Sequence, residues 1–597
     1  MFVEKLKTTF AWNRVLCRLF AAWFAFASLI LLLNGEEFFS LSYAQSVSFG
    51  TLLLAVLAFF ALFSCLAFFC GEYPVDSWLL LLFSFICCCY WSLAYADEEN
   101  SFLFVLAVLV VFSMVVVTFI KQNQALLSAI SFGKRSTAVL VGVFGVISCG
   151  VIIVITVLRY RTFSSPNFDF GLFCNMFHNM KETGLPYVTS ERDRLLSHFA
   201  VHISPIYYLL LPFYLVFPRP ETLQVGQAVI LAASIVPTVL LAKHFKLSNK
   251  VTVLMAGLYA FYPALSAGCF YDLHENCFLP FFLLFTFYFF EKKKYLPMYV
   301  SVAFVLMVKE DAAIYLLVFA LFILLSEKNV LHGSILAALS LGYFFLATYL
   351  LREFGEGVMT SRFQNLIFDK ETGLFGAIKT ILLNPGFGLT QLFTTSKNTW
   401  EKVAYVLQML LPLGLLPFCT KKSSRWLLLT PMLINLLSYY VYQYDIGFQY
   451  HFGITAFLIY ATLKNLPELA LPTKQTLLGI AAAACCCLYL TTVIPTWQGY
   501  IDRYTENRDS YQKMEAFLDT IPEDASVCCS SFLLAHIADR DVIYEAEYHK
   551  NAPDIDYVVL DRRYRQSESV KDAYLQQGYT YHAQCEDLIL VLQAPDQ

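Results

Sequence analysis

Apolar runs of about twenty residues recur along this chain, and they constrain its fold more than any other feature. A helix of that length crosses the ~30 Å hydrocarbon core of a bilayer. We predict about fifteen spans of this kind, at residues 15–34, 49–70, 76–96, 101–120, 137–158, 222–243, 250–270, 276–291, 295–308, 312–326, 331–351, 403–419, 425–442, 450–464 and 474–495. The sequence therefore predicts an all-α polytopic membrane protein.

Composition agrees with this fold class. Of the 597 residues, 58% are hydrophobic and 14% are charged, whereas soluble proteins carry about 25% charged residues. The formal net charge of −4 provides no basic field for a polyanion, so we expect no nucleic acid partner. Most of the 17 cysteines lie within apolar runs and resemble small buried hydrophobic residues, so we predict neither a disulfide framework nor a zinc site.

The basic loops predict the orientation, because Lys and Arg stay on the cytoplasmic side. The N-terminus, with Lys5 and Lys7, and the loop 121–135 are basic, whereas Glu36, Glu37 and residues 97–99 are acidic and belong outside. With an odd number of spans, the N-terminus is cytoplasmic and the C-terminus is extracytoplasmic, in the plasma membrane.

Two regions do not read as ordinary spans. Residues 203–217 are short and contain Pro205 and Pro212, so we predict a juxtamembrane or re-entrant helix on the outer side. The pair 295–308 and 312–326 is also short and could instead be one long helix or a broken pair, and every later side assignment depends on it.

We predict three parts. Residues 1–136 form N-terminal transmembrane helices that could be an added module, and residues 137–495 form the core, with long outer loops at 159–202 and 352–402. Residues 496–597 are far richer in charge and combine short β-like runs with helical stretches, which predicts a small soluble α/β domain outside the membrane.

Ionisable side chains near membrane depth are costly, so their positions point to function. Under this topology, polar clusters from separate loops converge on the outer face. The candidate site residues are Asp169, His198, His202, Asp272, His274, Glu275, Lys309, Glu310, Asp311 and His451, the last of which is accompanied by Asp445. Such convergence is what an active site requires.

Each cluster also has a structural interpretation. Asp169 could be a helix cap. His198 and His202, four residues apart, could bind a metal or a phosphate on one helix face, or could be interfacial histidines without a ligand. The cluster at 272–275 could be the solvated ends of two spans. The triplet at 309–311 interrupts an apolar stretch, so for it we favour function.

These motifs, in this order, resemble those of a prokaryotic family of membrane proteins known as domain of unknown function 2079. The segments that carry the resemblance are Phe168–Gly171, His198–Pro205, Phe270–Glu275, Val308–Ala312 and the pair Tyr450-His451. The resemblance runs from about residue 160 through the C-terminal domain and leaves 1–136 uncovered.

That family is similar in architecture to the GT-C glycosyltransferases, which take a sugar from a polyprenyl-phosphate donor. The resemblance implies a GT-C-like core and, because an acidic residue in the first long outer loop lies at the active site of those enzymes, it implies a catalytic role for Asp169. Cys174 and Asn175 stand where the family often has an acidic or amide residue. The metal ligands therefore stay unassigned, and a divalent cation is an open possibility for the cofactor.

The chemistry of the residues agrees with sugar transfer. A carboxylate such as Asp169 can take the proton of an acceptor hydroxyl, and cations can stabilise the departing phosphate. Lys309, His198, His202 and His274 are our candidates for the phosphate, and Glu310, Asp311, Asp272 and Glu275 are our candidates for sugar hydroxyls or a metal. The expected partners are the polyprenyl-phosphate sugar, membrane lipid and an acceptor that is a glycan, lipid or protein.

Two other classes remain open. A transporter or lipid flippase would use intramembrane acidic residues, and a non-catalytic scaffold or receptor would use the exported domain. Against transport, the polar residues gather on one side in loops, and no inverted repeat is visible.

Overall fold

The computed structural model describes residues 9–35, 38, 40–71, 73–96, 101–192, 194–357, 360–369, 373–394, 400–549 and 555–595. Lys5, Lys7, Glu36, Glu37 and residues 97–99, on which the predicted orientation partly rests, lie outside these ranges.

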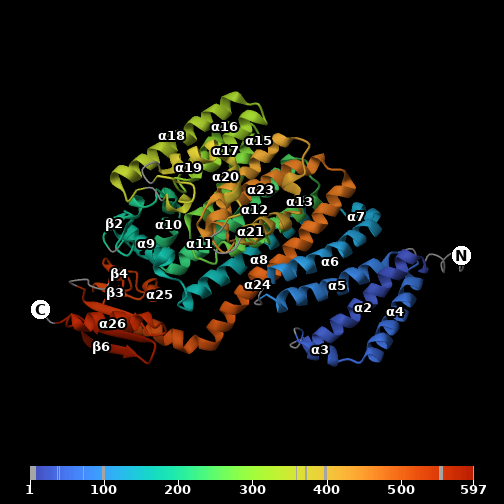
Figure 1. Ribbon diagram of the computed structural model, residues 1–597, viewed down its shortest axis with the longest axis horizontal. Helices are drawn as coiled ribbons and strands as arrows, with labels where there is room; N and C mark the ends of the chain where they lie inside the picture. Colours follow the sequence, from blue (N-terminus) through green and yellow to red (C-terminus); the bar gives the residue numbers. More distant parts are fainter. Residues whose placement is uncertain are drawn as a thin grey trace.

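Nine membrane-length apolar helices run through the described residues (Figure 1). They are α2 (Trp12–Asn34), α4 (Phe49–Cys70), α5 (Val75–Ala94), α6 (Ser101–Gln122), α8 (Lys134–Arg161), the continuous pair α11 (Pro220–Ala233) and α12 (Ile235–His244), the pair α13 (Asn249–Ala260) and α14 (Pro263–Ala267), α18 (Val330–Phe354) and α24 (Leu471–Leu518). The prediction of an all-α polytopic membrane protein is confirmed.

The other six predicted spans are helices of eight to fourteen residues. They are α15 (Leu279–Glu291), α16 (Tyr295–Leu306), α17 (Ala312–Leu325), α21 (Trp400–Leu410), α22 (Thr430–Leu437) and α23 (Phe452–Asn465). At 1.5 Å per residue even fourteen residues reach only about 21 Å, which is less than the ~30 Å of hydrocarbon. None of these six helices is therefore long enough by itself to cross the hydrocarbon core.

The weakest predicted pair, 295–308 and 312–326, forms two separate helices, α16 and α17. The turn between them carries Lys309, Glu310 and Asp311, and the backbone N–H of Ile206 donates to the carbonyl of Met307 at its start, at 3.0 Å. The segment predicted at 203–217 is a 3₁₀ helix (Pro205–Leu209) followed by α10 (Leu211–Val216), and it is as short as predicted.

The first four long helices form a bundle of their own, drawn in blue in Figure 1. Asp76 is buried in the first turn of α5, at one end of this bundle, and its carboxylate accepts hydrogen bonds from Arg18 at 2.9 Å and from Arg14 at 2.8 Å. Helices α5 and α6 of this N-terminal bundle pack against α24 of the core.

The C-terminal domain is a five-stranded sheet with the order β4-β3-β5-β7-β6. Its strands are β3 (Val527–Cys529), β4 (Ile543–Glu545), β5 (Tyr557–Asp561), β6 (Thr580–Cys585) and β7 (Ile589–Gln593), accompanied by α25 (Ser531–Leu534) and α26 (Gln566–Gln576). β3 runs parallel to β4 and β5, whereas β7 is antiparallel to β5 and β6. The predicted α/β domain is confirmed, and β6 is a strand that the sequence pattern did not indicate.

Helix α24 joins this domain to the core. It continues for 48 residues from Leu471 to Leu518, past the expected boundary at 496, with a kink at Asn507. Figure 1 shows it as the long orange helix that runs from the bundle down to the sheet.

Candidate functional site

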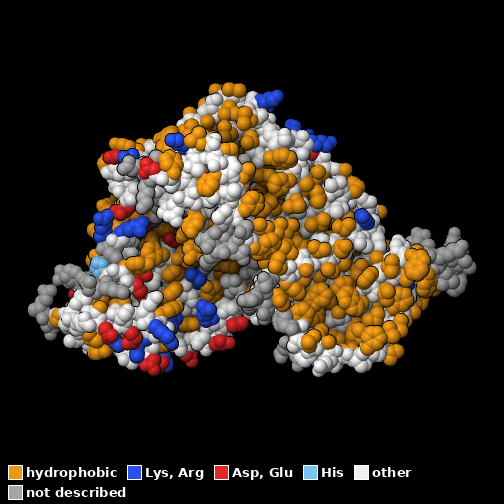
Figure 2. All heavy atoms as spheres, viewed as in Figure 1, with side chains coloured by type: hydrophobic (Ala, Val, Ile, Leu, Met, Phe, Trp, Pro, Cys, Tyr) orange, Lys and Arg blue, Asp and Glu red, His pale blue; other side chains and the backbone are white. Residues whose placement is uncertain are grey.

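The candidate residues gather at the end of the bundle that carries the C-terminal domain, which we call the domain end. This end is formed by the C-termini of α8 and α18, the start of α11, the segment 268–278 and the turn 307–311. Figure 2 shows charged side chains concentrated over this part of the molecule and over the C-terminal domain, whereas the surface of the N-terminal bundle is mainly hydrophobic.

A buried ion pair lies at the centre of the cluster. Lys309 Nζ lies 3.0 Å from Glu275 Oε1, and both side chains are almost fully buried. Tyr207 donates a hydrogen bond of 2.6 Å to the other carboxylate oxygen, and His274 Nδ1 lies 3.2 Å from it. Burial alone would raise the pKa of Glu275, but His274, Lys309 and the Tyr207 hydroxyl outweigh it and hold the pKa well below its usual range.

Asp169 differs from Glu275 in accessibility. It lies in a π-helical turn, Asn167–Gly171, and its side chain is only partly buried. Its carboxylate makes no hydrogen bond or ion pair with any residue that the structure describes. Burial raises the pKa of Asp169 to about 7, Glu275 acts in the same direction, and Lys309 and Arg362 oppose it. Asp169 is thus a carboxylate that exchanges protons near neutral pH.

The two predicted histidines at 198 and 202 are each held by a different glutamate. His198 Nδ1 lies 2.9 Å from Glu191, and His202 Nδ1 lies 2.9 Å from Glu310. Their rings are 6.1 Å apart. Among the described residues no group of three or more His, Cys, Asp or Glu side chains is arranged to hold a metal ion. The two histidines therefore belong to two separate carboxylate–imidazole pairs near Lys309.

Asp272 and His451 lie in other networks. The Asp272 carboxylate accepts hydrogen bonds from Arg159 at 2.9 Å, Ser165 at 2.9 Å and Gln224 at 2.8 Å. His451 Nε2 lies 2.6 Å from the carbonyl oxygen of Ala264. These contacts tie Asp272 to the end of α8 and His451 to α14, so neither side chain reaches the Glu275–Lys309 pair.

The remaining two acidic candidates differ in exposure. Asp311 is partly exposed at the start of α17, next to Glu310 in the same turn. Asp445 is exposed, and it accepts a hydrogen bond from the backbone N–H of Gly447 at 2.8 Å.

Arg362 is a site residue that the sequence did not reveal. Its guanidinium lies over the rings of Tyr440 and Tyr450, with 5.3 Å and 4.8 Å to their centroids. Its charge also lowers the pKa of Asp169. The residue lies in the predicted outer loop 352–402, and no motif around it distinguishes it from other charged residues of that loop. Lys309 and Arg362 thus supply two cations near the Asp169 carboxylate.

The C-terminal domain holds the segment that carries Asp169. The backbone N–H of Asn167 donates to Ser531 at 3.1 Å, and its side-chain amide donates to Glu545 at 2.7 Å. Ser531 and Glu545 lie at the carboxyl ends of β3 and β4. A Cβ atom at Gly171 would come within 2.9 Å of Leu534 Cδ2, so a larger residue there would have to displace the Leu534 side chain of the domain.

Helix α9 (Leu172–Thr183) makes a second contact with the domain. The Asn175 amide donates to the carbonyls of Ala538, at 3.1 Å, and Arg540, at 2.9 Å, and its oxygen accepts from the backbone N–H of Thr189 at 3.2 Å. Asn175 is therefore a docking residue for the domain.

We expect Asn175→Leu to loosen the domain. The change removes three hydrogen bonds and leaves buried backbone groups unpaired, at a cost of about 1–3 kcal/mol for each group. Limited proteolysis should then cleave the C-terminal domain from the membrane core at protease concentrations that leave the wild type intact.

Asn179→Leu is the matched control for Asn175→Leu. Asn179 lies one turn further along α9, and its amide bonds only to carbonyls of Asn175 and Tyr187, outside the domain. Equal protease sensitivity of the two variants would contradict the docking role of Asn175.

Apolar helices of membrane length, joined to an α/β domain that docks on the segment carrying Asp169, define a polytopic membrane protein with a C-terminal α/β domain. The chain belongs to the family described as predicted membrane protein (DUF2079), whose model matches residues 159–590. The match confirms the resemblance seen in the motifs, and it leaves the N-terminal bundle outside. No curated protein matches the chain.

Among solved structures, the chain is similar to the crystal structure of ArnT from Cupriavidus metallidurans bound to undecaprenyl phosphate. The two share 10% sequence identity with a TM-score of 0.44, and the match covers 76% of this chain and 99% of that one.

Proposed function

We propose that this chain is an integral-membrane glycosyltransferase of the GT-C type. It moves a sugar from a polyprenyl-phosphate donor to an extracytoplasmic acceptor, with Asp169 as the base. The observation that carries the proposal is the Asp169 carboxylate, which is partly exposed, has a pKa of about 7 and lies within the electrostatic influence of Lys309 and Arg362.

The proposed reaction uses these groups in one displacement. Asp169 takes the proton of the acceptor hydroxyl as that oxygen attacks the anomeric carbon of the sugar. The bond between the anomeric carbon and the phosphate oxygen breaks, and polyprenyl phosphate leaves with the electron pair. Lys309 and Arg362 stabilise the negative charge that develops on the phosphate. His198, His202, His274 and Glu310 surround them as candidate contacts for the phosphate and the sugar.

An apolar cavity at the domain end supports a lipid-linked donor. Its volume is about 690 Å³, and it is lined by α10 and α11 side chains together with Leu210 and Phe278. Leu210 is three residues from Tyr207, and Phe278 is three residues from Glu275, so the inner wall of the cavity adjoins the ion-pair cluster. Arg161 and Arg219 lie at the same cavity. In the proposal, the prenyl chain occupies this cavity while its phosphate faces the cluster.

The proposed orientation places the domain end outside the cell and the N-terminus in the cytoplasm of the plasma membrane. Lys243, Lys246 and Lys250 lie at the opposite end of the bundle, as the positive-inside rule requires of a cytoplasmic face.

The test is transfer by the purified protein in liposomes that contain a panel of radiolabelled polyprenyl-phosphate sugars. Release of polyprenyl phosphate together with a labelled acceptor supports the proposal. Absence of turnover with every donor, accompanied by ion-coupled uptake of solute into the vesicles, would replace it with transport.

The pH dependence of turnover follows from the pKa of Asp169, about 7. A base acts in its ionised form, so kcat/KM should rise about tenfold per pH unit below the pKa and become constant above it. The measurement is kcat/KM between pH 5 and 9. A profile that is flat or falls across pH 7 would exclude Asp169 as the base.

A further inference from the structure

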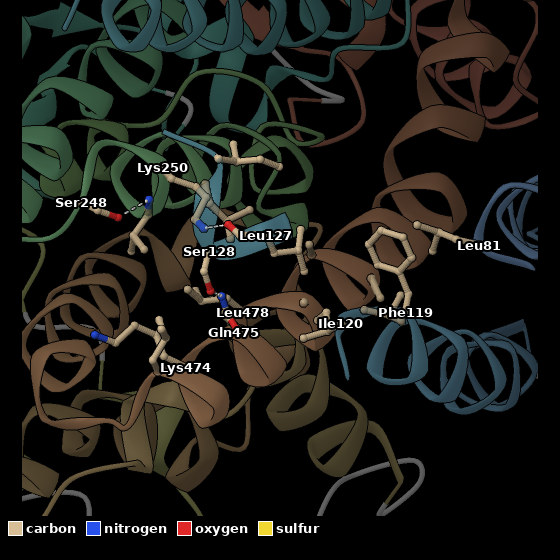
Figure 3. A pocket seen from close by; sticks show the side chains of 18 of the residues that line it. Leu81, Phe119, Ile120, Leu127, Ser128, Ser248, Lys250, Lys474, Gln475 and Leu478 are labelled. Atoms are coloured by element: carbon tan, nitrogen blue, oxygen red, sulfur yellow. Dashed lines mark hydrogen bonds between the residues drawn. The ribbon is translucent and has the colours of Figure 1, made fainter. Parts of the chain in front are cut away.

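A second large cavity lies at the opposite end of the bundle, between the N-terminal bundle and the core. It is lined by α5, α6 and α7 (Gln124–Ala129) on one side and by α13 and α24 on the other, and its volume is about 970 Å³. Most of its lining is apolar, with Leu81, Phe119, Ile120 and Leu478 among the side chains that Figure 3 labels. The cavity therefore has room for hydrocarbon chains.

The polar groups of this cavity lie together. In Figure 3, Ser248, Lys250 and Lys474 lie at one side, and Leu81 and Phe119 lie at the other. Two lysines and no acidic residue line the described part of the cavity. The cavity is therefore amphipathic, with a cationic end and an apolar end.

Two polar groups at the cationic end lack partners. Lys250 donates to the carbonyl of Leu127, but the Lys474 ammonium makes no hydrogen bond or ion pair with any described residue. The Gln475 amide nitrogen donates to Ser128 at 3.4 Å, whereas its buried oxygen Oε1 accepts no hydrogen bond from the residues that the structure describes. A cation and an adjacent acceptor are thus available to a ligand.

The cavity lies at the end where the basic loops gather. α8 begins beside it and ends at the candidate site, and the Asn249 amide donates to the carbonyl of Phe132, at the start of α8, at 2.7 Å. Lys243 and Lys246 precede α13 at the same end. Basic residues concentrate at the cytoplasmic face of membrane proteins, so the cavity opens at the level of the inner leaflet.

We propose that this cavity binds one anionic phospholipid of the inner leaflet, of the phosphatidylglycerol class. The phosphate accepts from Lys474, the head-group hydroxyls donate to Gln475 Oε1, and the acyl chains lie along α6 and α24. The bound lipid completes the contact between the N-terminal bundle, which lies outside the family match, and the core. The proposal is independent of glycosyl transfer.

The test is native mass spectrometry of the detergent-purified protein, titrated with phosphatidylglycerol or with phosphatidylcholine of the same acyl chains. The wild type should bind one phosphatidylglycerol at least tenfold more tightly than phosphatidylcholine. Lys474→Ala should lose that preference. Lys421→Ala is the matched control, because Lys421 is exposed at the same end and does not line the cavity, and it should keep the preference.

Ala482→Trp provides a second variant, because Ala482 lines the apolar end of the cavity and an indole there would occupy the space of an acyl chain. It should lose the bound lipid while keeping the thermal unfolding temperature of the lipid-free protein. Equal binding of both lipids, or unchanged binding by Lys474→Ala, would show that the cavity holds only non-specific annular lipid and would overturn the proposal. Occupation by a second copy of the chain, seen as a dimer that phosphatidylglycerol does not dissociate, would overturn it too.

Discussion

Asp169→Asn should lower the rate of sugar transfer by about 10²–10⁴-fold, the usual contribution of a general base. Asparagine has nearly the same shape but cannot accept the proton of the acceptor hydroxyl. The Asp169 carboxylate has no partner among the described residues, so its replacement breaks no contact that the structure shows. Donor binding and the thermal unfolding temperature should therefore remain close to those of the wild type. The measurement is release of labelled polyprenyl phosphate under single-turnover conditions.

Asp445→Asn is the control for this experiment. Asp445 is an exposed carboxylate in another loop of the domain end, bonded only to the backbone of its own loop, and its replacement should leave the rate within twofold. The residual activity of Asp169→Asn should also lose its rise through pH 7. A variant that turns over at the wild-type rate would show that another group takes the proton.

Glu275→Gln should destabilise the protein by about 3–5 kcal/mol, the cost of leaving a charge buried without its partner. Lys309 would lie beside a neutral amide, and the Tyr207 hydroxyl would lose a charged acceptor. The measurement is reversible unfolding by denaturant in mixed micelles, followed by tryptophan fluorescence.

Two further variants identify the cause. Lys309→Met in the Glu275→Gln background removes the unpaired cation, so the double variant should recover part of the lost stability. Glu221→Gln breaks the more exposed pair with Arg161 and should cost at most about 1 kcal/mol. Equal losses from Glu275→Gln and Glu221→Gln would show that the buried pair contributes no more than a surface pair does.

The hydropathy of the sequence predicted the fold class but not the length of every helix. The apolar run 403–419 reads as a span, yet it contains Pro412, Gly414 and Pro417. The chain ends α21 at Leu410 and continues in 3₁₀ turns around Gly414, which has a positive φ of 58°. Proline lacks the backbone N–H of a helix interior, a property that a hydropathy average does not register.

The sequence predicted only part of the candidate site, because it does not show which side chains are partners in space. Glu275 and Lys309 lie 34 residues apart, and the prediction that loops on one face converge brought both into one group. The same reasoning included Asp272, whose oxygens the structure assigns to Arg159 and two neutral donors, because spacing alone cannot show which carboxylate already has partners. Arg362 went unnoticed because its significance comes from Tyr440 and Tyr450, which are distant in sequence.

The docking of the C-terminal domain also bears on what that domain can do. In sheets with parallel strands, ligands enter at the carboxyl ends of the strands, where neighbouring connections diverge. At that edge, Ser531 and Glu545 already bind Asn167 of the core. The membrane core thus occupies the position of a ligand at this edge of the sheet, and a fragment cut free of α24 and the core would expose an edge that is covered in the intact protein.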